Sequence, residues 1–178
     1  MKKKIAVITG AGVSAESGFA TFRDAGGLWE QYDVQEVASI EGWYRNPSLV
    51  LGFYNDRRAQ LKDAKPNGAH LDIAALENDF NVDVITQNVD NLHEKAGSTN
   101  VLHLHGELTK ARPENDDSES KIIDIGYRAM EYGEKNDDGE TLRPHIVWFG
   151  EAVPAITEAA RLVRNADIFA VIGASLVV

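Results

Sequence analysis

Short apolar runs that stop at glycine or polar residues constrain the fold of this chain more than any other feature. The first run, Ile5–Thr9, stops at Gly10. Short runs of this kind are typical of buried parallel strands that end in a turn. Similar runs follow at 82–86, 101–104, 146–149 and 168–172. The sequence therefore predicts a sheet built from short, buried strands.

Helical patterns lie between these runs. Ser48 is a candidate N-cap for a helix that carries apolar residues from 50 to 61. Residues 71–76 belong to a second helical stretch, and residues 156–163 show the i, i+3, i+4, i+7 spacing of a third. Strands that alternate with helices predict an α/β fold, a Rossmann-like doubly wound parallel sheet. Residues 112–141 are polar and glycine-rich, so we expect a small inserted module or loop there.

Composition excludes several classes of protein. The net charge of −10 disfavours direct binding to nucleic acid. The absence of cysteine excludes disulfides, thiolate catalysis and a thiolate zinc site. No apolar run reaches membrane-spanning length, and the run after the N-terminal lysines is too short for a signal peptide. We therefore expect a cytoplasmic protein with no membrane partner.

Two polar segments follow predicted strands. The stretch Gly10–Gly18 has glycines that let the backbone approach a pyrophosphate, although its spacing departs from the strict G-x-G-x-x-G pattern. The pattern alone leaves an ordinary glycine turn equally open. Residues 87–93 carry amides and a carboxylate that suit ribose hydroxyls or a carboxamide. A polar turn that caps the next helix explains them equally well.

Two histidines, His103 and His105, lie at alternate positions of one predicted strand and therefore point to the same face. They could form part of a metal site, although no further ligand can be named. A histidine at a strand end is also placed for general-base catalysis, because its pKa lies near neutrality. A structural histidine is the third reading, and on the pattern alone it is the more common outcome.

Taken together, the motifs resemble those of the sirtuin family. The segments GAGVSAESGFATFRD, TQNVDNLHEKAG, HGEL, LRPHIVWFGE and GASL occur in the family's order. The resemblance covers most of the chain outside 112–141. It implies an NAD-dependent protein deacylase that acts on acylated lysine side chains of other proteins and yields nicotinamide and O-acyl-ADP-ribose. It gives no prediction of the oligomeric state.

The resemblance also implies roles for individual residues. His105 would be the general base, and Asn88 would act with it. Val147, Phe149, Gly150 and Glu151 would bind the substrate peptide as a strand. The residues that would contact NAD are Gly10, Ala11, Gly12, Ser14, Glu16, Phe22, Arg23, Trp29, Gln87, Asn88, Asp90, His105, Gly173, Ala174 and Ser175.

Tyr54 and Arg57 lie three residues apart on a predicted helix and so share one face. A core tyrosine with an arginine at the rim would look the same. The segment is nevertheless similar to the Y-x-x-R pair of sirtuins that remove succinyl and malonyl groups. The resemblance therefore implies that these two side chains bind the acyl carboxylate, and that desuccinylation and demalonylation accompany deacetylation.

Two departures from the family pattern stand out. Residues 112–141 contain neither cysteine nor histidine, so the inserted module is expected to lack the zinc that most sirtuins carry. Residues 1–178 are expected to form a single catalytic domain truncated at its C-terminus. Alternative functions are a mono-ADP-ribosyltransferase or NAD hydrolase, and a catalytically silent sensor of NAD or ADP-ribose.

Overall fold

A four-stranded parallel sheet forms one half of the molecule. The computed structural model describes residues 2–18 and 32–175. The strand order is β3-β2-β1-β7, and each neighbouring pair is parallel. The strands are β1 (Lys4–Thr9), β2 (Asn81–Thr86), β3 (Val101–His103) and β7 (Ile168–Ile172). The predicted parallel sheet is confirmed.

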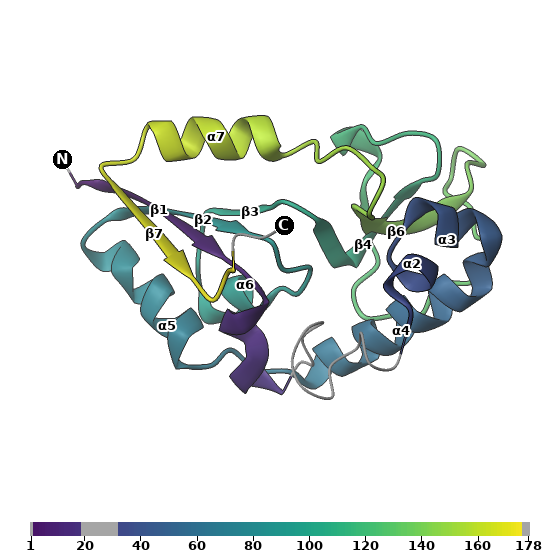
Figure 1. The fold of residues 1–178 in the computed structure, drawn as a ribbon, viewed down its shortest axis with the longest axis horizontal. Coiled ribbons are helices and arrows are strands. Elements are labelled where there is room, and N and C mark those ends of the chain that lie inside the picture. Colours follow the sequence, from purple (N-terminus) through teal and green to yellow (C-terminus); the bar gives the residue numbers. More distant parts are fainter. Residues whose placement is uncertain (1, 19–31, 176–178) are drawn as a thin grey trace.

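Helices cover both faces of this sheet, as a doubly wound fold requires (Figure 1). Val7 of β1 packs with Ile73 of α5 (Gly68–Ala75) on one face. The neighbouring Ala6 packs with Ala159 of α7 (Ile156–Arg164) on the other. Successive residues of a strand point to opposite faces, so one short apolar run serves two hydrophobic layers.

The longest helix, α4 (Pro47–Asp63), runs below the second half of the molecule (Figure 1). The prediction that Ser48 caps it is wrong. The Asn46 side chain accepts a hydrogen bond from the Leu49 backbone N–H at 3.1 Å, and Pro47 occupies the first helical position. Proline suits that position because its fixed φ is helical and its missing N–H would have no partner there.

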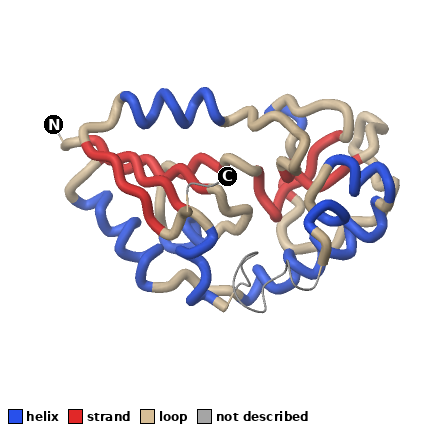
Figure 2. Tube along the Cα trace, viewed as in Figure 1, coloured by secondary structure: helices blue, strands red, loops and turns tan. Residues whose placement is uncertain are grey.

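The second half of the molecule contains a separate antiparallel sheet with strand order β5-β4-β6 (Figure 2). Its strands are β4 (Gly106–Pro113), β5 (Ile123–Asp124) and β6 (Leu142–Ile146). The polar stretch 112–141 therefore supplies only part of this sheet, because β4 begins at Gly106 and β6 ends at Ile146. The remaining short elements are α2 (Val34–Val37), α3 (Ile40–Arg45), α6 (Leu92–Ala96), η1 (Ala11–Ser17), η2 (Leu76–Asn78) and η3 (Glu119–Lys121).

The predicted strand 146–149 is wrong, because β6 ends at Ile146. The chain turns there instead. The Trp148 backbone N–H donates to the Glu151 carboxylate at 2.9 Å, and the Glu151 N–H donates to the Trp148 carbonyl at 3.0 Å. Phe149 then bonds to the linker between α2 and α3, with its N–H on the Ala38 carbonyl at 2.9 Å.

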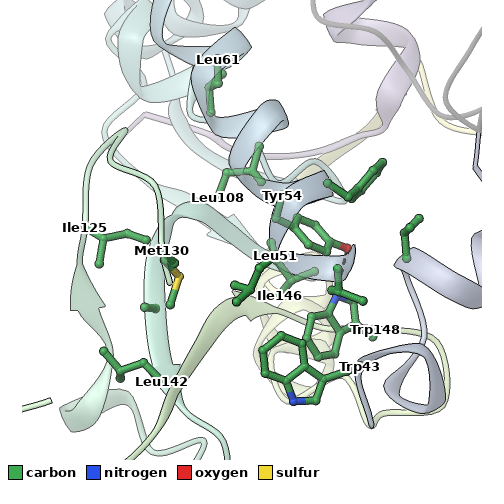
Figure 3. Packing of buried hydrophobic residues seen from close by; sticks show 14 of the residues in the cluster. Trp43, Leu51, Tyr54, Leu61, Leu108, Ile125, Met130, Leu142, Ile146 and Trp148 are labelled. Carbon is green, nitrogen blue, oxygen red and sulfur yellow. Dashed lines mark hydrogen bonds between the residues drawn. The ribbon is translucent and has the colours of Figure 1, made fainter. Parts of the chain in front are cut away.

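A large hydrophobic core joins α4 to the antiparallel sheet (Figure 3). Its buried side chains come from segments that are far apart in the sequence. We call this part of the molecule the module, meaning α2, α3, α4, β4, β5, β6 and the turn 147–151. Buried residues of the core include Trp43, Leu51, Tyr54, Leu61, Leu108, Ile125, Met130, Leu142, Ile146 and Trp148.

Within residues 2–18 and 32–175, no helix combines the length and the apolar character that crossing a membrane would require.

Candidate functional site

Two glycine loops meet at the carboxyl end of the parallel sheet. The Gly12 N–H donates to the Gly173 carbonyl at 3.0 Å, so the loop after β1 touches the loop after β7. A Cβ at Gly10 would lie 2.8 Å from the Cα of Ala174, and one at Gly12 would lie 2.9 Å from the Gly173 oxygen. Glycine is therefore required for these loops to approach, and the structure brings these predicted residues together.

A buried polar network lies directly behind this contact. The Ser14 hydroxyl donates to the Asp90 carboxylate at 2.9 Å. The Asn88 amide donates to Ser14 Oγ at 3.1 Å and to the Gly10 carbonyl at 3.2 Å. Ser14, Asn88 and Asp90 are each less than a tenth exposed. Loops that follow two different strands thus supply one connected network, as expected at the carboxyl edge of an α/β sheet.

Sequence reasoning missed one member of this network, His70. Its Nδ1 accepts a hydrogen bond from the Asn67 backbone N–H, so its proton lies on Nε2, which faces Ser14 Oγ at 3.4 Å. Asn67 and His70 form a capping box at the start of α5. The asparagine three residues before a histidine is the signal that could have found it.

Burial governs the electrostatics of the network. Desolvation raises the pKa of Asp90, although its hydrogen bonds from the Leu92 backbone and Ser14 oppose this shift. Desolvation lowers the pKa of His70, against the opposing charge of Asp90. Both shifts favour the uncharged forms, so this part of the site holds its geometry mainly through directed hydrogen bonds.

His105, the predicted general base, lies between β3 and β4. Its Nδ1 is 2.9 Å from the Gln87 carbonyl oxygen, which can only accept, so the ring proton lies on Nδ1. Nε2 therefore presents a lone pair. Burial lowers the pKa of His105, which keeps the ring neutral near pH 7. The arrangement gives His105 the tautomer and charge state that a general base needs.

His103 has a different environment. Its Nδ1 contacts the Asn88 carbonyl oxygen at 2.9 Å, and its Nε2 lies 2.8 Å from the Glu94 carboxylate. Among the described residues, Glu94, His103 and Glu107 are close enough to hold a metal ion. Ion pairs account for all three, however, because Glu107 pairs with Lys110 at 2.5 Å. His105 is not part of this cluster, so the structure does not assemble the metal pair that the alternation left open.

Tyr54 and Arg57 are both buried on α4, each 2% exposed. The Tyr54 hydroxyl accepts a hydrogen bond from the Trp148 indole N–H at 2.9 Å. Burial lowers the pKa of Arg57 to about 10, so the guanidinium stays charged at neutral pH. The charge of Asp90 opposes that shift, which places Arg57 within electrostatic reach of the network described above.

The segment expected to bind a peptide is only partly free to do so. The N–H groups of Val147 and Phe149 donate to the carbonyls of His105 and Ala38, each at 2.9 Å. The Glu151 carboxylate binds the buried Arg143 at 2.7 and 2.9 Å. Its side chain is thus used within the protein. The Phe149 side chain is 44% exposed, and Gly150 is exposed as well.

The other described residues predicted to contact NAD lie around this network. Glu16 is exposed, and Gln87 contributes its backbone carbonyl to His105. Ala11 and Ser175 lie on the two glycine loops. Three predicted cofactor contacts lie outside the described residues: Phe22, Arg23 and Trp29.

The parallel sheet, its glycine loops and the network at its carboxyl edge define a Rossmann-like nucleotide-binding fold. The Sir2 family profile matches residues 10–178, and the chain belongs to this family. It is 57% identical over 178 residues to an NAD-dependent protein deacylase of Bacteroides thetaiotaomicron, which covers 98% of this chain and 76% of the relative.

Solved structures agree with this assignment. A Sir2 homologue in complex with NAD superimposes with a TM-score of 0.86 and is 40% identical, covering 99% of this chain and 70% of that one. A Sir2 protein with a deacetylated p53 peptide and 3'-O-acetyl ADP-ribose gives a TM-score of 0.83 at 33% identity. That match covers 99% of this chain and 74% of the other.

Proposed function

We propose that this protein, an NAD-dependent protein deacylase of the Sir2 family, removes succinyl and malonyl groups from lysine side chains in addition to acetyl groups. The observation that carries the proposal is the buried pair of Tyr54 and Arg57 on α4. Burial strengthens the attraction between a guanidinium that stays charged at neutral pH and a carboxylate that reaches it. A carboxylate at the end of an acyl chain would be such a ligand, because the guanidinium fork matches its two oxygens.

The residues present fit NAD. The backbone of the Gly10–Gly12 loop lies at the carboxyl edge of the sheet, where α/β folds bind nucleotides. Asn88 and Asp90 bring polar groups suited to ribose hydroxyls and a carboxamide. When bound, NAD supplies an electrophilic ribose carbon with nicotinamide as its leaving group. Val147, Phe149, Gly150 and Glu151 would hold the acylated peptide beside it.

His105 would accept a proton from a ribose hydroxyl. Its neutral ring, with Nδ1–H held by the Gln87 carbonyl, leaves Nε2 as the accepting atom. Burial lowers the pKa of His105, so the ring stays neutral and able to accept a proton at lower pH than an ordinary histidine. Asn88, anchored by Gly10 and Ser14, would position the ribose rather than move protons.

The test is an assay on acetyl-, malonyl- and succinyl-lysine peptides, with and without NAD, followed by mass spectrometry. Deacylation predicts O-acyl-ADP-ribose, whereas an ADP-ribosyltransferase or NAD hydrolase would not form it. The Arg57→Met variant should lose roughly ten- to a hundredfold in kcat/KM on succinyl-lysine, the worth of a charge-assisted hydrogen bond. It should lose far less on acetyl-lysine. Equal losses on both peptides would make Arg57 a structural residue and overturn the acyl specificity.

A further inference from the structure

The Trp148 indole makes a hydrogen bond that determines what the Tyr54 hydroxyl can do. The indole N–H can only donate, so at 2.9 Å the Tyr54 oxygen must be the acceptor (Figure 3). The proton on that oxygen is then left for another partner. Within residues 2–18 and 32–175, the Tyr54 hydroxyl donates to no acceptor. A buried hydroxyl proton in this state calls for a ligand that accepts.

The indole is itself held rigidly. The Arg143 guanidinium lies over the Trp148 ring, 3.6 Å from its centroid. Arg143 also binds both oxygens of Glu151, and one of those oxygens accepts the Trp148 backbone N–H. Both Arg143 and Trp148 are 2% exposed. The ion pair between Arg143 and Glu151 thus holds both the ring and the backbone of Trp148. The indole N–H therefore points in one direction, toward Tyr54.

Accordingly, we infer that Trp148 is a positioning residue for acyl-group selection, an inference that rests on the proposed desuccinylase function. The Trp148 N–H donates to a lone pair of the Tyr54 oxygen, so the Tyr54 O–H is left to act as a donor. A carboxylate only accepts, so a committed donor next to the Arg57 guanidinium suits succinyl and malonyl groups. The terminal methyl of an acetyl group offers no acceptor and gains nothing from this arrangement.

Trp148→Phe keeps an aromatic ring over the ion pair and removes the N–H. We expect KM for succinyl-lysine peptide to rise about three- to tenfold, the worth of one hydrogen bond, with a much smaller change in kcat. The ratio of succinyl to acetyl efficiency should fall by the same factor. The double variant Tyr54→Phe/Trp148→Phe should show the same succinyl-to-acetyl ratio as Tyr54→Phe alone, because without the hydroxyl the indole N–H has nothing to position. An effect that persists without the hydroxyl would make Trp148 merely structural and overturn the inference.

Trp43→Phe is the matched control. Trp43 is equally buried, packs against Trp148 with ring centroids 5.3 Å apart, and donates its N–H to Glu114 instead. It should change stability without changing the succinyl-to-acetyl ratio. If Trp148→Phe does not fold, 3-benzothienylalanine at position 148 preserves the bicyclic shape without the N–H and makes the same test. If succinyl activity depends on Arg57 but not on the N–H of Trp148, the inference about Trp148 is wrong and the proposed function stands. If the wild-type protein is inactive on succinyl-lysine, both the proposed function and this inference are wrong.

Discussion

The parallel sheet and the module bury their apolar residues in different ways. In the sheet, the inner strand β1 buries Ala6 and Val7 completely, whereas the edge strand β7 carries Phe169 and Val171, which are 50% and 38% exposed. In the module, Leu108 of β4 and Leu142 of β6 are almost completely buried in the core that this sheet shares with α4. A continuous apolar run in the sequence therefore marks a strand without fixing how deeply it is buried. The module reaches its deep core with scattered large side chains from separate segments.

The largest expected effect concerns the junction of these two regions, where His105 follows β3 and precedes β4. His105→Ala should reduce deacylation by roughly 10²–10⁴, the usual cost of losing a general base. NAD binding, which we assign to the sheet, should persist. Steady-state kinetics and calorimetric titration with NAD measure the two quantities separately. Near-normal turnover would remove His105 from the mechanism.

Paired core substitutions test the contrast in burial directly. Leu108→Ala should lower the free energy of unfolding by about 2–5 kcal/mol, because it leaves a cavity in a fully buried site. Val171→Ala, at a partly exposed position of β7, should cost less than about 1 kcal/mol. Urea denaturation of both variants compares them. Similar losses would mean that the edge strand β7 is packed as well as the core of the module.

Each region also contains a histidine that burial keeps neutral, with a pKa of about 4 for His93 in α6 and for His145 in β6. A folded-state pKa below the usual 6.5 means that stability is full above that value and is lost as pH falls toward 4. For the buried His93 the loss at pH 5 is about 2 kcal/mol. His103, whose ion pair with Glu94 raises its pKa, works in the opposite direction.

Denaturation curves at pH 7 and pH 5 measure this dependence. His93→Gln should make it shallower, since a glutamine does not titrate and can still bond to the Thr9 hydroxyl, which lies 2.9 Å from His93 Nε2. A variant with the wild-type pH dependence would assign the loss to other groups, His145 first.

The smallest expected effect is that of a metal chelator on the module. Its core is apolar and the chain has no cysteine, so EDTA should leave the melting temperature unchanged within error. Metal analysis of the purified protein checks the same point. A lowered melting temperature together with stoichiometric zinc would show that a metal, and not packing alone, holds the module.

The sequence predicted the parallel sheet well because each of its strands is one local apolar run, and β7 has the expected bounds, Ile168–Ile172. It failed where distant segments decide the structure. The contact between Tyr54 and Trp148 joins residues 94 positions apart, and no periodicity records it. The Asn46 cap, by contrast, could have been predicted, because proline at the first helical position places the cap one residue earlier.

The same holds for the site. Gly10, Ser14, Asn88 and His105 were predictable because the motifs keep their order along the chain. The use of the Glu151 carboxylate to hold Arg143 was not, since the sequence shows an acidic residue without showing its partner. Motifs thus identified which residues gather at the sheet edge, and the packing decided which of their atoms remain available.

The contact between the two glycine loops also has a consequence for biosynthesis. The Gly12 N–H donates to the Gly173 carbonyl, so the loop after β1 completes its shape only when β7, the last described strand, has joined the sheet. During translation, the loop that contains Gly12 therefore cannot reach its final structure until residues more than a hundred positions later have been synthesised. Contacts of such long range slow folding and prolong the exposure of unpaired strands. Ribosome-stalled chains that stop before residue 168 should accordingly depend more on chaperones than the released protein does.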